Sequence, residues 1–226
     1  MKDKMLLLHG ALGSQNQFTS LKEVLDEFYE VHTLNFEGHG GIASTQKFSI
    51  NLFTQNVIGF LEEHAITEVQ IFGYSMGGYV ALNTALRIPE KIKKIITLGT
   101  KFRWDIASAQ HEGTMLNPDK IEEKVPHFAD KLRLDHHPQD WKGVMRKTAQ
   151  MMIDMGNGAK IQDDDFRKID VGVVIGVGSL DNMVSHEESE YIASLIPNAK
   201  LVELEGVKHP IDKVGIDVLV DYIRAH

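Results

Sequence analysis

The sequence contains no cysteine among its 226 residues. It therefore has no disulfide framework, no thiol nucleophile and no cysteine-based metal site. It also has no concentrated basic run, since 24 Lys and Arg residues stand against 32 Asp and Glu residues and the net charge is −8. This balance argues against nucleic acids and anionic membrane surfaces as partners, and it is typical of a soluble protein.

Long apolar runs are absent from the first residues. The stretch MKDKMLLLHG holds an apolar run of only four residues, which is too short for the core of a signal peptide or for a membrane span. We therefore expect a cytoplasmic protein that does not bind membranes.

What the sequence does contain is an alternation of short Val- and Ile-rich runs with longer amphipathic segments, the pattern of a parallel sheet. A hydrophobic content of 42% over this length is enough for one well-buried core. The expected strands are Lys4–Leu8, Val31–Phe36, Val69–Phe72, Ile92–Leu98, Val171–Val177 and Lys200–Leu204. Helices are expected between them, including one that begins with the capping box Ser185 and Glu188, and a last helix from His209 onward. The fold class is therefore α/β.

One interval interrupts this alternation. About seventy residues separate Thr100 from Val171, far more than an ordinary connection needs, and such excursions are usually functional. The interval has its own helix signals, because Asn117 precedes a proline and an amphipathic stretch ends at Gly156. We predict a helical cap inserted before the fifth strand. The predicted division is a core of residues 1–101 and 167–226 and a cap of residues 102–166.

A serine lies between glycines where an apolar run gives way to a helical segment. The letters GYSMG, from Gly73 to Gly77, match the G-x-S-x-G nucleophile elbow, in which a sharp strand-to-helix turn exposes the hydroxyl of Ser75. The preceding strand and the following Ala- and Leu-bearing helix are the context that the motif requires. The alternative is a glycine-rich turn whose serine only caps the helix.

A nucleophilic serine needs a base and an orienting carboxylate, which would follow in the order Ser, Asp or Glu, His. Asp181 comes just after the fifth expected strand, and His209 just after the sixth. Both lie past the carboxyl ends of parallel strands, the edge where open α/β sheets build their sites. Taken singly, Asp181 fits an ordinary turn and His209 a surface loop, but together with Ser75 they predict a catalytic triad.

These motifs resemble the α/β-hydrolase superfamily, and in particular its small bacterial serine esterase-like members. The resemblance covers nearly the whole chain and rests on LLLHGALGS, FEGHGG, GYSMGG, GSLDNMV and GVKHP. It implies that the backbone N–H groups of Ala11 and Met76 form the oxyanion hole. It also implies that His9 and His39 are structural histidines of loop motifs, so that neither is the base.

The sequence departs from the family pattern in two places. The family's sheet usually begins with two more strands before the His-Gly dipeptide, but only eight residues precede His9 in this sequence. We therefore expect six strands, with Val31–Phe36 at a margin that a partner subunit, as in a homodimer, or the chain's own loops would cover. The loop after that strand carries Asn35 and Glu37 where relatives often have aspartate and proline.

Other side chains gave weaker signals. The stretch LDHHPQD sets Asp135, His136, His137 and Asp140 close together, but adjacent residues do not share a helix face, so we expect no metal. The methionines of the cap are most simply core residues, although methionine also suits an irregular acyl pocket. The candidate substrate-binding residues are Tyr74, Trp141, Met145, Met152 and Met155.

The sequence thus predicts a serine hydrolase that cleaves a small carboxylic ester or thioester through an acyl-enzyme, without a cofactor. Its partner is a small-molecule acyl substrate. One alternative is carbon–carbon bond hydrolysis or a lyase step on the same triad, because substrate choice is set by the cap. Another is a non-catalytic ligand-binding member of the fold.

Overall fold

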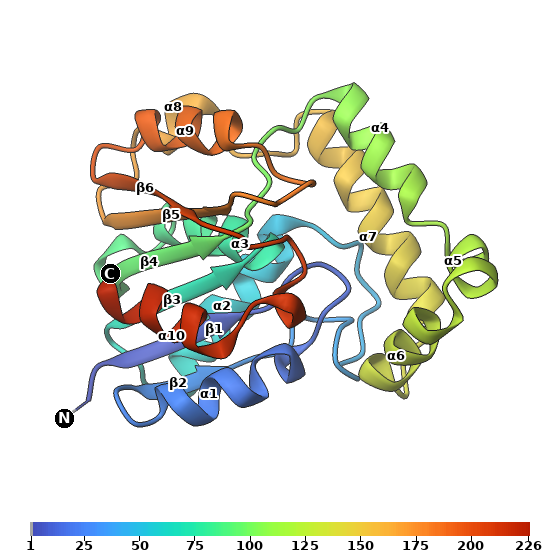
Figure 1. Ribbon diagram of the computed structural model, residues 1–226, viewed down its shortest axis with the longest axis horizontal. Helices are drawn as coiled ribbons and strands as arrows, with labels where there is room; N and C mark the ends of the chain where they lie inside the picture. Colours follow the sequence, from blue (N-terminus) through green and yellow to red (C-terminus); the bar gives the residue numbers. More distant parts are fainter. Residues whose placement is uncertain (1) are drawn as a thin grey trace.

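The structure is a computed structural model that describes residues 2–226. Its centre is a six-stranded sheet in the order β2-β1-β3-β4-β5-β6, in which every neighbouring pair is parallel (Figure 1). The strands are β1 (Lys4–Leu8), β2 (Glu30–Thr33), β3 (Val69–Tyr74), β4 (Ile92–Leu98), β5 (Gly172–Gly178) and β6 (Ala199–Leu204). The predicted α/β class and the six parallel strands are confirmed.

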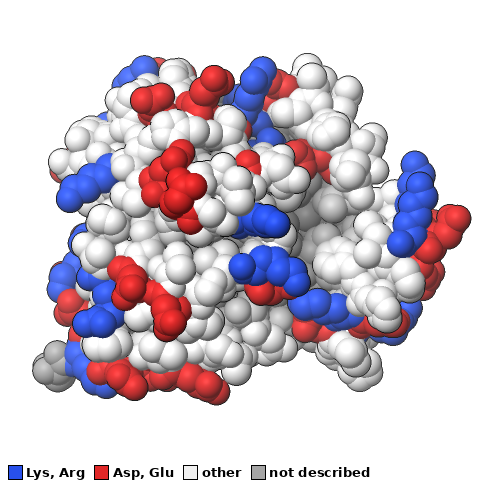
Figure 2. Space-filling view, viewed as in Figure 1, with Lys and Arg blue, Asp and Glu red and all other residues white. Residues whose placement is uncertain are grey.

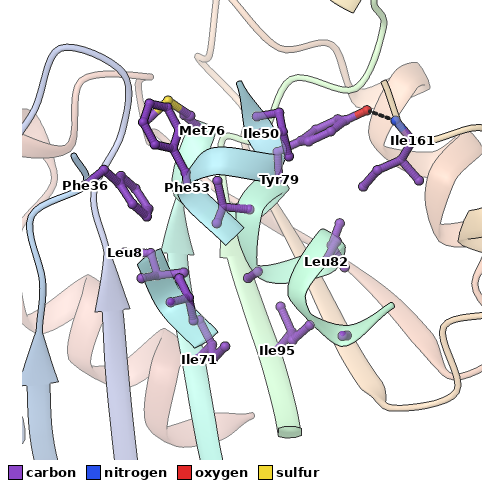
Figure 3. Close-up of a cluster of buried hydrophobic side chains, with 14 of the residues drawn as sticks. Leu8, Phe36, Ile50, Phe53, Ile71, Met76, Tyr79, Leu82, Ile95 and Ile161 are labelled. Atoms are coloured by element: carbon purple, nitrogen blue, oxygen red, sulfur yellow. Dashed lines mark hydrogen bonds between the residues drawn. The ribbon is translucent and has the colours of Figure 1, made fainter. Parts of the chain in front are cut away.

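Helices cover both faces of the sheet because successive side chains of each strand point to opposite sides. In β1, Leu6 and Leu8 belong to one buried cluster, whereas Met5 and Leu7 belong to the other. Figure 3 shows part of the first cluster, with Leu8 near Ile71 and Phe36 near Phe53. Helices α2 (Ile50–Glu63), α3 (Met76–Ala85) and α9 (His186–Leu195) supply the first cluster, and α1 (Thr19–Leu25) and α10 (Ile216–Ala225) supply the second.

Two predicted boundaries were wrong by more than two residues. Strand β2 ends at Thr33 rather than Phe36, because the backbone N–H of Phe36 donates to the ring of His9 and no longer takes part in the ladder. The last helix begins after Gly215, not at His209. Between them lies a short 3-10 turn at Ile211–Lys213, after which Val214 is extended and interrupts the helical conformation.

Five helices lie between β4 and β5: α4 (Ile106–Met115), α5 (Pro118–Lys124), α6 (Pro126–His136), α7 (Trp141–Gly156) and α8 (Asp163–Phe166). As predicted, Asn117 caps α5 and Ser185 with Glu188 forms a capping box on α9. Helices α4 to α7 stand beyond the carboxyl ends of the strands, whereas α8 lies beside α9 (Figure 1). Their role as a cap over the site stays a prediction.

Strand β2 is at a margin of the sheet, as expected. Part of this margin is covered from within the chain, because the carbonyl oxygen of Val31 in β2 accepts a hydrogen bond from Lys22 and the N–H of Val31 donates to Asp26. Coverage by a second subunit stays a prediction. Within residues 2–226, none of the helices has the length and apolar character needed to cross a membrane.

Candidate active site

Ser75 occupies the turn between β3 and α3, in a backbone conformation that side chains rarely adopt. Its φ is 51° and its ψ is −118°. The neighbouring glycines allow this turn, since a Cβ on Gly77 would lie 2.1 Å from the carbonyl oxygen of Leu8, and one on Gly78 would lie 2.1 Å from the hydroxyl of Thr100. Ser75 makes no side-chain cap to α3, so the helix-capping alternative is wrong. Strain of this kind is found at functional sites.

The structure brings Ser75, His209 and Asp181 into one hydrogen-bonded line. The Oγ of Ser75 lies 3.3 Å from Nε2 of His209, and the Nδ1 of His209 lies 2.8 Å from Oδ2 of Asp181. The other carboxylate oxygen of Asp181 accepts the N–H groups of Met183 and Val184 at 2.8 and 2.9 Å. All three residues follow carboxyl ends of strands, at the edge of the sheet that faces α7 (Figure 1).

The charge state of Asp181 suits an orienting role. Burial would raise its pKa, but the hydrogen bonds from His209 and from two backbone N–H groups outweigh burial and lower that pKa below its usual value. An ionised carboxylate accepts the proton of Nδ1, and this fixes the tautomer in which Nε2 has its lone pair directed to Ser75. The imidazole is therefore arranged to accept the serine proton.

Tyr74 supports the backbone of His209. Its hydroxyl donates to the carbonyl oxygen of His209 at 2.9 Å, and its side chain is 6% exposed. Tyr74 therefore supports the histidine, and its contact with a substrate stays a prediction. Gly99 also approaches closely, because a Cβ on it would lie 3.2 Å from both Asp181 Oδ2 and His209 Nδ1.

The N–H groups of Ala11 and Met76 are free donors within residues 2–226, since neither forms a hydrogen bond there. The peptide between Gly10 and Ala11 is fixed in orientation. Its carbonyl oxygen accepts Nδ1–H of His9 at 2.9 Å and the N–H of Gly13 at 3.1 Å. Because a trans peptide points its N–H opposite to its C=O, these two bonds also aim the N–H of Ala11.

His9 performs this task as a neutral ring. The N–H of Phe36 donates to its Nε2 at 3.2 Å, so the proton is on Nδ1. Burial lowers the pKa of His9 to about 4, which keeps the ring uncharged at neutral pH. His39 is also buried and stacks on Phe48 with ring centroids 5.1 Å apart. Both rings lie in the loop motifs and not against Ser75, as the resemblance implied.

The candidate substrate residues of the cap are mostly buried. Trp141, Met145 and Met155 are 5% exposed or less, and Met152 is half-buried against the same cluster. This cluster includes Met76, next to the nucleophile. Figure 2 shows a hollow in the molecular surface between the sheet and helices α5 to α7. Acidic and basic side chains are interspersed around it. Contact of these four residues with a substrate stays a prediction.

The polar stretch at the end of α6 has structural partners. Asp140 caps α7 by accepting the N–H groups of Lys142 and Gly143, and Asp135 pairs with Lys131. No group of three or more potential metal ligands is found within residues 2–226. His136 is fully buried, and its two ring nitrogens bond to loops of the core. Sequence reasoning missed this role, although Ala129, Leu132 and His136 recur at the spacing of one buried helix face.

Comparison with known proteins identifies the family of the fold. The model of the family described as alpha/beta hydrolase fold matches residues 4–142. The chain belongs to this family. A thermophilic esterase from Thermogutta terrifontis has a similar structure, with a TM-score of 0.80 and 18% identity over 100% of this chain and 89% of that one.

Two curated relatives of this α/β hydrolase differ in length. A pimeloyl-[acyl-carrier protein] methyl ester esterase from Neisseria meningitidis is 26% identical over 91% of this chain and 86% of its own length. A protein named "Probable alcohol acetyltransferase" from Wickerhamomyces anomalus is 24% identical over 70% of this chain, but this match covers 44% of its length. The chain thus spans less than half of that second relative.

Proposed function

We propose that the chain is a serine hydrolase that cleaves a small carboxylic ester or thioester. The hydroxyl of Ser75 attacks the substrate carbonyl while Nε2 of His209 takes its proton, and Asp181 stabilises the resulting imidazolium. The N–H groups of Ala11 and Met76 stabilise the negative charge that develops on the carbonyl oxygen. The imidazolium then returns its proton to the leaving alcohol or thiol, which departs and leaves an acyl-serine.

Deacylation repeats these steps with water. His209 takes a proton from the water, its oxygen attacks the acyl-serine, and the ester bond to Ser75 breaks as the serine recovers its proton. The products are a carboxylic acid and the regenerated enzyme. Every role is filled by a side chain or backbone group of this chain, so the reaction needs no cofactor.

The observation that carries this proposal is the contact of Ser75 with His209 in the strained turn, because a serine that only capped a helix would not face a carboxylate-held imidazole. The relative from Neisseria meningitidis, named a methyl ester esterase, supports the ester as the bond cleaved. Nothing in the site favours carbon–carbon bond cleavage or a lyase step over ester hydrolysis.

A fluorophosphonate probe and a series of p-nitrophenyl acyl esters test the proposal. We expect the probe to label the wild-type protein on Ser75 and the short esters to be hydrolysed. Ser75→Ala should abolish labelling and reduce kcat on the order of a thousandfold or more, with the unfolding midpoint nearly unchanged. A protein that folds but is neither labelled nor active would instead be a non-catalytic member of the fold. Near wild-type activity in Ser75→Ala would refute the triad.

A further inference from the structure

His136 connects the cap to the loop that carries one oxyanion donor. It is the last residue of α6, yet its ring lies among loops of the core and is fully buried. The N–H of Gly40 donates to its Nδ1 at 3.2 Å, so the ring proton is on Nε2. That proton is donated to the carbonyl oxygen of Leu12 at 3.1 Å.

The carbonyl of Leu12 is one end of a short hydrogen-bonded chain that leads to Ala11. The same peptide unit carries the N–H of Gly13, which donates to the carbonyl oxygen of Gly10 at 3.1 Å. The peptide of Gly10 in turn carries the N–H of Ala11. Two peptide planes therefore join the His136 ring to this N–H, and each bond in such a chain polarises the next.

The loop needs this external support because its conformation is strained. Leu12 has a φ of 59°, in the left-handed region that a residue with a γ-branched side chain seldom adopts. Such a residue keeps this conformation only when its surroundings hold it. Its carbonyl is held by His136, and its side chain is 9% exposed within the buried cluster.

The other side of the His136 ring is equally well anchored. Gly40, the donor to Nδ1, offers its carbonyl oxygen to the amide of Asn35 at 3.2 Å. The Oδ1 of Asn35 accepts the N–H of Gln15, which closes a circuit back to the loop that follows Leu12. Asn35, one of the residues that depart from the family pattern, therefore connects the loop of Gly40 to the loop that follows Leu12.

We propose that His136 is a positioning residue for the oxyanion hole: through Leu12 and Gly13 it holds the N–H of Ala11 in the orientation that stabilises the transition state. The cap then contributes to catalysis as well as to any substrate pocket. This inference rests on the proposed function, because it assigns a support to the donor that the serine mechanism uses.

Two substitutions test the two hydrogen bonds of the His136 ring separately. The amide of His136→Gln reaches the position of Nε2 and keeps a donor for Leu12, whereas the shorter His136→Asn keeps only an acceptor near Nδ1 for Gly40. We expect His136→Asn to lower kcat on a short acyl ester about 10- to 100-fold, with KM changed by less than about threefold, since an oxyanion donor acts on the transition state. His136→Gln should retain kcat within about fivefold of wild type.

A transition-state analogue and a control variant make the test specific. A trifluoromethyl ketone forms an oxyanion adduct with the serine, so its inhibition constant should rise in His136→Asn in parallel with the loss of kcat/KM. His127→Gln changes an exposed histidine on the same helix and should leave kcat, KM and inhibition unchanged. Equal kcat in both His136 variants and wild type, or a loss confined to KM, would overturn the inference.

Hydrogen exchange decides the point even where esterase activity is lacking. The N–H groups of Gly13 and Gln15 are bonded inside this loop, so a peptide covering residues 9–17 should exchange faster in His136→Asn than in His136→Gln or wild type. Equal exchange in all three proteins would show that His136 does not hold the loop. Wild type that shows no hydrolysis, together with faster exchange in His136→Asn, would refute the proposed function while leaving the positioning by His136 in place.

Discussion

At the scale of single residues, the site depends on glycines, whose lack of a side chain lets backbone segments approach closely. The backbones of β1 and α3 approach so closely that the carbonyl oxygen of Leu8 takes the space of a Cβ on Gly77. This approach sets the nucleophile of Ser75 beside the loop of His9 and Gly10. A glycine in a helix normally lowers stability, so a glycine here indicates a requirement for space.

Two Gly→Ala variants should therefore have opposite effects. Gly77→Ala should lower the free energy of unfolding by about 1–3 kcal/mol, because the methyl group overlaps a backbone atom that cannot rotate away. It should also lower kcat/KM, since Ser75 is two residues away. Gly59→Ala, in the exposed middle of α2 with no atom within 4 Å of the new methyl group, should raise stability by roughly 0.5–1 kcal/mol. Urea unfolding and ester hydrolysis measure both; a neutral Gly77→Ala would show that the close approach is not required.

At the scale of elements, the strands were predictable because buried parallel strands are continuous apolar runs, and β1 and β4 have the predicted bounds. The end of β2 was not predictable, since its last ladder positions are lost to a hydrogen bond from Phe36 to His9 across the fold. The three triad residues could be selected from motif order. The role of His136 could not, because its partners lie in loops about a hundred residues away in sequence.

Helix α7 carries four of the five residues predicted to contact substrate, and these four differ in burial. Met145 is fully buried, so Met145→Ala should create a cavity and lower the free energy of unfolding by about 2–5 kcal/mol. Met152 is half-buried, so part of its side chain is exposed for contact with a substrate. Met152→Ala should therefore damage the core less than Met145→Ala does. We expect it to change the ratio of kcat/KM between long and short acyl esters by about tenfold, since a methylene in an apolar pocket contributes about 1–3 kcal/mol.

The control for this selectivity is Met115→Ala, which truncates a methionine that is 63% exposed at the end of α4. It should leave both the ratio and the stability unchanged. If Met152→Ala loses stability while its ratio equals that of wild type, Met152 is an ordinary core residue. The acyl pocket would then have to be formed by other residues of the hollow beside α7.

At the scale of the whole molecule, three buried histidines connect the core to the cap. His9 and His39 lie in two loops of the core, and His136 is the last residue of α6. The ring centroid of His39 lies 5.2 Å from that of His9 and 5.6 Å from that of His136. Burial lowers the pKa of all three, to about 4 for His9 and well below the usual value for His39. Nε2 of His39 has no hydrogen-bond partner in the described part of the chain, so a proton there would be buried without an acceptor.

This cluster predicts a loss of stability in acid. The unfolded histidines titrate near 6.5, whereas the folded ones stay neutral to lower pH, so the unfolded chain binds more protons between these values. The contribution of these histidines to stability is therefore full above pH 6.5 and falls as the pH is lowered toward 4. His9 alone accounts for about 3 kcal/mol over this range, because its pKa is 6.5 in the unfolded chain and about 4 in the folded protein. Urea midpoints at several pH values measure the slope. His39→Phe, which keeps a ring against Phe48 and removes one titrating group, should give a shallower slope, and the exposed His127→Gln should give that of wild type. An unchanged slope in His39→Phe would mean that acid unfolding is controlled by groups outside this cluster.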